Sequence, residues 1–301
     1  MHAFCLPGLE ASLECTVSFM RSAMTFFSTD FTAYPFGSHK LVFVDELPTQ
    51  RFDSSTLSLV SCSLLHDSSA IEQVYETRLS LAHALACQWI GINIIQKAWS
   101  DTWLVNGIGL YMTGLFTKRL FGTNEYLFRL KKDMDRVVKL DIGTQPPICR
   151  PTFMEPPDSS SLPFINLKSP IVLHVLDRRL GKSGALHSLL RIIPKIFRSA
   201  LEGDMVENAL STQSFLRTCR KTSGFDPRTF ADQWIYGSGC PKFHFNIAFN
   251  KKKLVVEFTM KQECPAFIAN QDDPVALALL KPVSFFDVST VVYFGMSKML
   301  K

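Results

Sequence analysis

Apolar side chains recur at helical spacing over most of the chain up to Gly239. This pattern predicts helices over residues 8–28, 69–90, 101–121, 124–140, 169–179, 183–200, 211–220 and 227–236. Ser100 and Asp101 are expected to cap the third of these helices at its start, and Gly122 to close it. Two short runs before residue 69, LVFVDE and STLSLV, indicate strands. The expected fold class is mostly α with a β part.

The period of the pattern changes from the helical value to two after Gly239. Apolar and polar residues alternate over residues 243–249 and again over 254–260, and the polar residues 250–253 stand between them. This pattern predicts a β-hairpin that begins a β-sandwich, whereas residues 273–301 fit neither period. The run QPPICRPTFMEPPDSSSLPF contains too many prolines for a regular element, so we expect it to be a loop.

The composition is that of a folded protein large enough to be an enzyme. The 301 residues are 47% hydrophobic and 20% charged, and the net charge of +5 is too small to indicate nucleic-acid binding by itself. The eight cysteines form no C-x-x-C pair, which favours free thiols over disulfides or a zinc ribbon. No secretory signal is expected over residues 1–20, and residues 79–96 fit a buried helix and turn better than a membrane span.

Residues 81–109 carry the candidate chemistry. In zinc peptidases of the gluzincin type, the motif H-E-x-x-H places two imidazoles on one face of a helix, and its glutamate activates the metal-bound water. A glutamate on the following helix is the third ligand. HALACQWIG and WLVNGIG resemble the two corresponding runs of the zinc aminopeptidases, with the same 18 residues between the second and third ligand positions. The chain therefore resembles a gluzincin (thermolysin-like) aminopeptidase catalytic domain.

The side chains at the chemical positions of this frame are different. His83 stands at the first ligand position, Cys87 at the second and Asn106 at the third, and Ala84 replaces the general base. By the same resemblance, Asn166 stands where the family has an oxyanion-stabilising tyrosine, and the segment FDSSTLSLVSCSLL has no glutamate for a peptide's amino terminus. A neutral amide is a poor metal ligand and alanine accepts no proton, so we expect no metal, no cofactor and no catalysis.

An aminopeptidase frame without its catalytic residues resembles the family of TFIID subunit 2 proteins. The resemblance is carried by YPFGSHKLVFVDE, by the stretch from LAHALACQWIG through KKDMDRVV, and by SGFDPRTFADQWIYGSGCPKFHFNIAFNKKKLVVEFTMKQ. It implies a shortened or internal part of a longer protein. We expect a gluzincin-like pseudo-catalytic domain at residues 1–145, a Pro/Ser-rich loop at 146–163, the helical remainder of that domain at 164–238 and the start of a β-sandwich at 239–301.

This resemblance implies a nuclear protein that acts as a scaffold among other TFIID subunits and contacts core-promoter DNA, with no membrane and no small-molecule substrate. Short basic clusters are candidates to meet phosphate: Lys131, Lys132, Arg178, Arg179, Lys182, Lys251, Lys252 and Lys253. Two alternatives stay open. One is a divergent zinc metallo-aminopeptidase that adds a ligand such as His66 or Glu72 to His83 and Cys87, and the other is a pseudoenzyme that binds peptides in the old substrate cleft.

Overall fold

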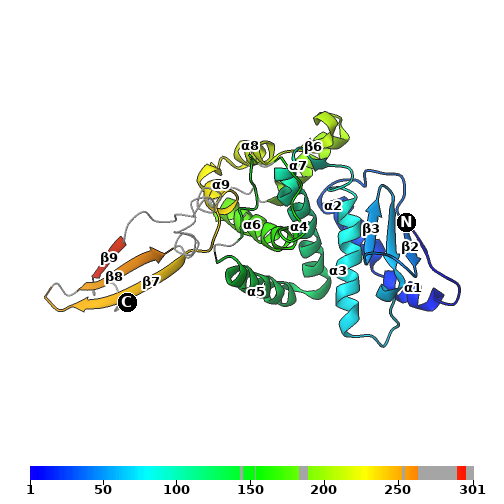
Figure 1. The fold of residues 1–301 in the computed structure, drawn as a ribbon, viewed down its shortest axis with the longest axis horizontal. Coiled ribbons are helices and arrows are strands. Elements are labelled where there is room, and N and C mark those ends of the chain that lie inside the picture. The colour runs from blue at the N-terminus through cyan, green and yellow to red at the C-terminus, as the bar shows by residue number, and fades with distance from the viewer. Residues whose placement is uncertain (143–144, 153, 183–188, 253–254, 264–289, 296–301) are drawn as a thin grey trace. The chain divides into compact units, whose positions relative to one another are not determined.

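The structure, a computed structural model, describes residues 1–142, 145–152, 154–182, 189–252, 255–263 and 290–295 (Figure 1). Two compact units are present: Met1–Asp133 with Pro151–Pro227, and Met134–Arg150 with Arg228–Lys301. The start of the helix predicted over 183–200, and most of 273–301, lie outside the described residues. No helix in the described ranges combines the length and low polarity that crossing a membrane requires.

The first unit begins with a four-stranded sheet. Its strands are β1 (His2–Phe4), β2 (Lys40–Val44), β3 (Arg51–Ser54) and β4 (Leu57–Ser61), in the order β1-β2-β4-β3. β1 and β4 run parallel to β2, and β3 runs antiparallel to β4. The strands predicted from LVFVDE and STLSLV are confirmed as β2 and β4, because their alternating side chains bury one face. β1 and β3 are too short for the pattern to reveal.

Four helices follow the predicted periodicity with changed limits. The helix expected over 8–28 is two helices, α1 (Glu10–Val17) and α2 (Met20–Asp30). The hydroxyl of Ser18 donates to the Cys15 carbonyl at the break, which competes with the backbone ladder. The next pair is α3 (Glu72–Cys87) and α4 (Thr102–Phe121), preceded by the 3-10 turns η1 (Cys62–Leu64) and η2 (Trp99–Asp101).

Both predicted limits of α4 are confirmed, because Asp101 occupies the N-cap position and Gly122 the C-cap position, but the capping role predicted for the Asp101 side chain is wrong. Gly122, with a φ of 93°, donates its N–H to the Lys118 carbonyl and closes the helix. Asp101 makes no side-chain cap. Its carboxylate instead accepts hydrogen bonds from the backbone N–H and the hydroxyl of Thr212, at 2.8 and 2.7 Å, because that buried helix start also needs an acceptor.

The remaining elements of this unit include α5 (Thr123–Leu140), which runs on into the second unit, α6 (Leu162–Lys182), α7 (Leu189–Leu201), α8 (Thr212–Ser223), the turn η3 (Val206–Asn208) and the parallel pair β5 (Ile95–Gln96) and β6 (Ala209–Leu210). α6 begins inside the segment predicted to be a loop. Pro163 causes no conflict there, because the first helical turn needs no N–H at that position. The predicted start at residue 169 is therefore wrong.

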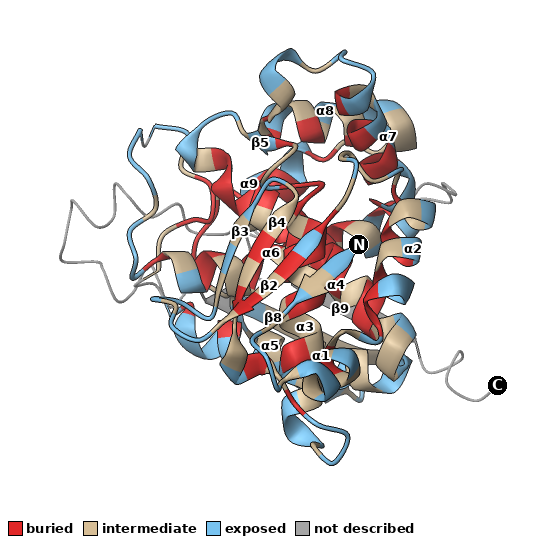
Figure 2. Cartoon of the chain, turned by 90° about the vertical axis from the view of Figure 1, so that its right-hand side faces the viewer, coloured by how far each residue is buried: buried red, intermediate tan, exposed pale blue. Residues whose placement is uncertain are grey.

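The core of the first unit lies between α3, α4 and α6 (Figures 1 and 2). Trp89 and Trp103 are buried, as the apolar pattern predicts, and Trp89 packs against the ring of Phe27. Gly107 allows α4 to approach α6 closely, since a Cβ at that position would lie 2.8 Å from the Cβ of Ser169. This close packing fixes the position of α4 beside α6.

The second unit contains α9 (Arg228–Trp234) and a three-stranded antiparallel sheet. Its strands are β7 (Lys242–Asn250), β8 (Val255–Glu263) and β9 (Thr290–Gly295), with Phe245 opposite Met260 and Ile247 opposite Phe258. The predicted hairpin is therefore confirmed, and β9 is a third strand that the pattern did not reveal.

Candidate functional site

His83 and Cys87 lie one helical turn apart on the same face of α3. The Sγ atom of Cys87 is 3.7 Å from Nε2 of His83. α4 passes this pair at Gly109, where a Cβ would lie 3.6 Å from the same imidazole nitrogen. The helix pair predicted from the sequence is thus present, and its first two ligand positions are in contact.

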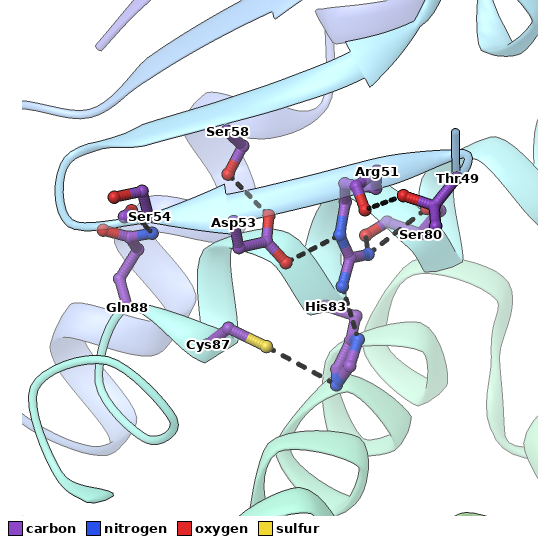
Figure 3. A network of polar contacts seen from close by, with 9 residues as sticks. All are labelled: Thr49, Arg51, Asp53, Ser54, Ser58, Ser80, His83, Cys87 and Gln88. Carbon is purple, nitrogen blue, oxygen red and sulfur yellow. Dashed lines mark hydrogen bonds and ion pairs between the residues drawn. The ribbon is translucent and has the colours of Figure 1, made fainter. Parts of the chain in front are cut away.

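An arginine that sequence reasoning missed lies against this pair. Arg51 of β3 donates from Nη2 to Nδ1 of His83 at 2.9 Å (Figure 3). Its Nη1 donates to the backbone carbonyl of Ser80 and, at 3.2 Å, to the Ser80 hydroxyl. Because Ser80 is one turn before His83 on α3, the guanidinium spans the helix face that would face a metal.

The charge of Arg51 is balanced by one carboxylate. Its Nε donates to Oδ2 of Asp53 at 2.8 Å, and each side chain of this pair is 15% exposed. Ser58, which is opposite Asp53 in the β3–β4 register, donates its hydroxyl to Oδ1 of Asp53 at 2.7 Å. The Arg51 guanidinium therefore has a hydrogen-bond acceptor for each of its three nitrogens, and the network is closed.

The protonation state of His83 follows from this geometry. Burial, and after it the positive charge of Arg51, lower the pKa of His83 to about 3. The ring is therefore neutral at pH 7. Since an arginine can only donate, Nδ1 of His83 is the acceptor and its single proton is on Nε2, which faces Cys87. Neither ring nitrogen of His83 presents a free lone pair to a metal.

Cys87 is an equally poor ligand. Burial, followed by the charge of Asp53, raises the pKa of Cys87 to about 12, with Arg51 opposing. Zinc binds the thiolate rather than the thiol. At neutral pH this sulfur therefore carries its proton and behaves as a small buried apolar group.

The other two degenerate positions contact each other. The amide nitrogen of Asn106 on α4 donates to Oδ1 of Asn166 on α6 at 2.9 Å. The third ligand position and the oxyanion position are thus joined by a neutral hydrogen bond between helices. Ala84, at the position of the general base, is fully buried and offers no acceptor.

The donor set at this site does not fit a zinc ion. A catalytic zinc needs three charged or lone-pair-bearing protein ligands and a water, whereas this site has a protonated thiol, a blocked imidazole, a paired amide and a resident cation. Within the described ranges, no group of three or more His, Cys, Asp or Glu side chains has the arrangement that a metal ion needs.

His66 and Glu72, the additional zinc ligands considered from the sequence, lie away from His83 and Cys87. Nδ1 of His66 is within 3.0 Å of the Asp67 carbonyl, and Cys15 is 3.8 Å away. Glu72 is exposed in the first turn of α3. It is eleven residues before His83, which is about 16 Å along the helix axis.

The basic candidates occupy separate elements. Lys131 and Lys132 are exposed on α5, Arg178 and Arg179 are exposed on α6, and Lys251 and Lys252 are exposed in the β7–β8 turn. The Lys182 side chain and all of Lys253 lie outside the described residues. Among the described side chains of this set, none contacts the Arg51 network.

Two sequence signals could have revealed the network. Arg51 and Asp53 are two apart, so a strand would place their opposite charges on one side. Ser80 and His83 are three apart, so a helix would place both on one face. What no pattern shows is that this strand edge faces this helix.

Comparison with known proteins defines the class of the fold. The Peptidase family M1 domain matches residues 12–234. The chain therefore belongs to peptidase family M1. Among curated proteins, it is similar to transcription initiation factor TFIID subunit 2 of Schizosaccharomyces pombe, with 44% identity over 257 residues, and of Saccharomyces cerevisiae, with 34% over 273 residues.

These matches cover 85% and 87% of this chain but 22% and 19% of the two relatives. The chain thus spans about a fifth of the length of these curated relatives. The resemblance to TFIID subunit 2 that the sequence indicated is confirmed.

A solved structure confirms the expected fold class. The crystal structure of Legionella pneumophila aminopeptidase A in complex with aspartic acid matches 86% of this chain and 29% of its own, with a TM-score of 0.67 and 19% identity. At this identity the likeness shows the fold alone. The chain has an aminopeptidase-like fold, mostly helical with β parts.

Proposed function

We propose that this chain is a non-catalytic, aminopeptidase-like part of the transcription initiation factor TFIID. In this role it is nuclear, acts as a scaffold among other TFIID subunits and contributes to core-promoter contact. The similarity to relatives named TFIID subunit 2 supports the proposed place of this chain in TFIID. The single observation that carries the loss of catalysis is the Arg51–His83 hydrogen bond, which places a fixed cation beside the first ligand position.

The geometry weighs against the enzyme alternative. A metallo-aminopeptidase built on His83 and Cys87 would have to free Nε2 of the imidazole, ionise the buried thiol and accept a divalent cation beside Arg51. Each change opposes a contact that the fold already makes. No contact among the described residues favours a peptide in the old substrate cleft, so a peptide-binding role stays a prediction.

Affinity capture tests the scaffold role. The tagged full chain is incubated with a nuclear extract, recovered, and its partners are identified by mass spectrometry. The control is a tagged zinc aminopeptidase domain of the same family. We expect TFIID subunits to be enriched with this chain and absent with the control. Equal recovery of TFIID subunits with both proteins, or with neither, would contradict the proposal.

A further inference from the structure

Three helices of the first unit meet around the side chain of Tyr126. The ring of Tyr126, on α5, lies against Gly114 of α4, where a Cβ would be 3.3 Å from Cε2 of the ring. The phenol oxygen is 3.2 Å from Nδ1 of His174 on α6. The Nζ atom of Lys118, one turn after Gly114, is 6.0 Å from the centre of the same ring.

This junction carries an excess of positive charge. Arg178 is one turn after His174 on α6 and is exposed, whereas Lys118, Tyr126 and His174 are half-buried. Burial, and after it the charge of Arg178, lower the pKa of His174; the carboxylate of Asp177 opposes this shift and Lys118 adds to it. The imidazole therefore lies in the field of two cations and one carboxylate.

Asp177 supplies a negative charge in this junction, which acts on His174 and Tyr126. Oδ1 of Asp177 accepts the backbone N–H of Leu189 at 2.8 Å. Among the described side chains, ion pairs join Arg51 to Asp53 and Arg129 to Glu125, and neither Lys118 nor Arg178 takes part in one. The two cations exceed the single charge of Asp177, so the junction keeps a net positive charge that attracts an external anion.

We propose that Lys118, Tyr126, His174 and Arg178 form a binding site for one phosphodiester of a nucleic-acid backbone. An arginine fork, an ammonium, an imidazole and a phenol can each donate to one of the several oxygens of a phosphate. The choice of nucleic acid as the polymer rests on the proposed role in transcription initiation. Contacts of this kind position a duplex and read no sequence.

The proposed site contains only one of the basic residues that the sequence offered as phosphate contacts. It includes Arg178 but not Arg179, because successive helical residues point about 100° apart. It adds Lys118, which is far from Arg178 in the sequence, and His174, which is near Arg178 but belongs to no basic cluster. A specific arrangement, rather than local charge density, therefore defines the site.

Binding at this site is coupled to a proton. The groups that face His174 are Lys118 from α4, Tyr126 from α5, and Asp177 and Arg178 from its own helix. A bound phosphate favours the charged imidazole and opposes the effect of the two cations. Protein that binds the anion takes up a proton, so affinity increases as the pH falls from 7.5 to 6.

Fluorescence anisotropy with a labelled 30-base-pair DNA duplex tests the site in the full chain. The variant K118A/R178A is compared with K97A/R179A, which removes the same charge from exposed positions elsewhere in the same unit. We expect the first variant to weaken binding about tenfold at 100 mM salt and to reduce the salt slope by about 1 to 2, and the control to weaken it less than threefold. Thermal melting checks that both variants are folded.

The other outcomes decide against the site. Equal losses in the two variants, or no loss in K118A/R178A, would mean diffuse attraction and overturn the proposal. So would a glutamate-rich peptide that binds more tightly than the duplex and depends on the same two side chains. H174Q should abolish the gain in affinity between pH 7.5 and 6; an unchanged pH profile also contradicts the site.

The same measurements separate this inference from the proposed function. A chain that captures TFIID subunits but does not bind the duplex through Lys118 and Arg178 overturns the site and leaves the scaffold role in place. A chain that binds the duplex there but captures no TFIID subunit overturns the scaffold role and supports the site.

Discussion

The Nη2 atom of Arg51 donates to Nδ1 of His83 at 2.9 Å, from a strand edge to the helix that carries the first two ligand positions. This contact fixes the ring's tautomer, directs its proton towards Cys87, and holds a positive charge on the metal-facing side of α3. The M1 fold thus holds an internal cation beside the positions that the resemblance assigns to the metal ligands.

Removal of the arginine should destabilise the first unit. In Arg51→Leu, the carboxylate of Asp53 remains largely buried without its partner, and the Ser80 carbonyl and His83 lose a donor. Loss of one member of such a pair costs about 3–5 kcal/mol. Urea unfolding followed by circular dichroism should show this fall in the free energy of unfolding.

The double variant Arg51→Leu/Asp53→Leu is the matched control. Replacing both charges by apolar groups leaves no unpaired ion, so the free energy of unfolding should recover by several kcal/mol relative to the single variant. A single variant as stable as the wild type would show that the network contributes nothing.

Restoring the family's motif residues should not be enough to restore the metal. In A84E/C87H/N106E, the Arg51 guanidinium still lies roughly 6 Å from a metal on Nε2, and its repulsion of a divalent cation is on the order of 5 kcal/mol. Adding Arg51→Gln removes that charge. Calorimetric zinc titration should show affinity at least a thousandfold higher for the quadruple variant.

The triple variant alone is the informative comparison in that titration. If it binds zinc as tightly as the quadruple variant, the cation has no role in excluding the metal. The single variant Arg51→Gln should not bind zinc tightly, because Cys87 and Asn106 are unchanged in it.

Two buried histidines should make the fold sensitive to mild acid. Burial lowers the pKa of His83 to about 3, with help from Arg51, and burial lowers the pKa of His39 to about 4. The folded state therefore binds fewer protons than the unfolded state, whose imidazoles titrate near pH 6.5. Stability from these neutral rings is complete above about pH 6.5 and is lost as the pH falls towards 4.

The size of the effect can be tested by substitution. His83→Gln keeps an acceptor for Arg51 but cannot titrate, so its loss of unfolding free energy between pH 7 and pH 5 should be about 2 kcal/mol smaller than that of the wild type. His39→Leu should show a similar reduction. Parallel pH profiles for the wild type and His83→Gln would exclude a buried neutral imidazole at position 83.

Gly107 should tolerate no side chain. In Gly107→Ala the new methyl would lie 2.8 Å from the Cβ of Ser169, so α4 and α6 must move apart. Overpacking of this kind costs about 1–3 kcal/mol. Gly181→Ala is the control: it is exposed near the end of α6 with no atom within 4 Å of the added group, and it should be neutral or slightly stabilising. Equal effects in thermal melts would contradict the close helix contact.

The elements with a strong period could be predicted, and those set by side-chain competition could not. Helix α4 and the β7–β8 hairpin follow directly from spacing and turn residues. The break between α1 and α2, and the use of Asp101 as a partner for Thr212, depend on hydrogen bonds that apolar periodicity does not encode. The start of α6 was missed because Pro163 indicates a loop unless it falls in a first turn.

The candidate site shows the same division. The pairing of His83 with Cys87 follows from helical spacing. Asn106 and Asn166 contact each other, and the roles that the resemblance assigns to these two positions stay predictions. The contact of Arg51 with His83 could not be predicted, because the packing of the β3 strand edge against α3 is a long-range feature that no local pattern shows. The division into domains at residues 145, 163 and 238 stays a prediction.

Metal content and peptidase activity of the same preparation test the central claim most directly. The full chain is incubated with excess zinc at pH 7.5, dialysed, analysed by inductively coupled plasma mass spectrometry, and assayed with aminoacyl-coumarin substrates beside an active aminopeptidase of the family. We predict far less than one zinc per chain and no turnover above the blank. One equivalent of retained zinc together with measurable turnover would contradict the claim that this site has lost its metal and its chemistry.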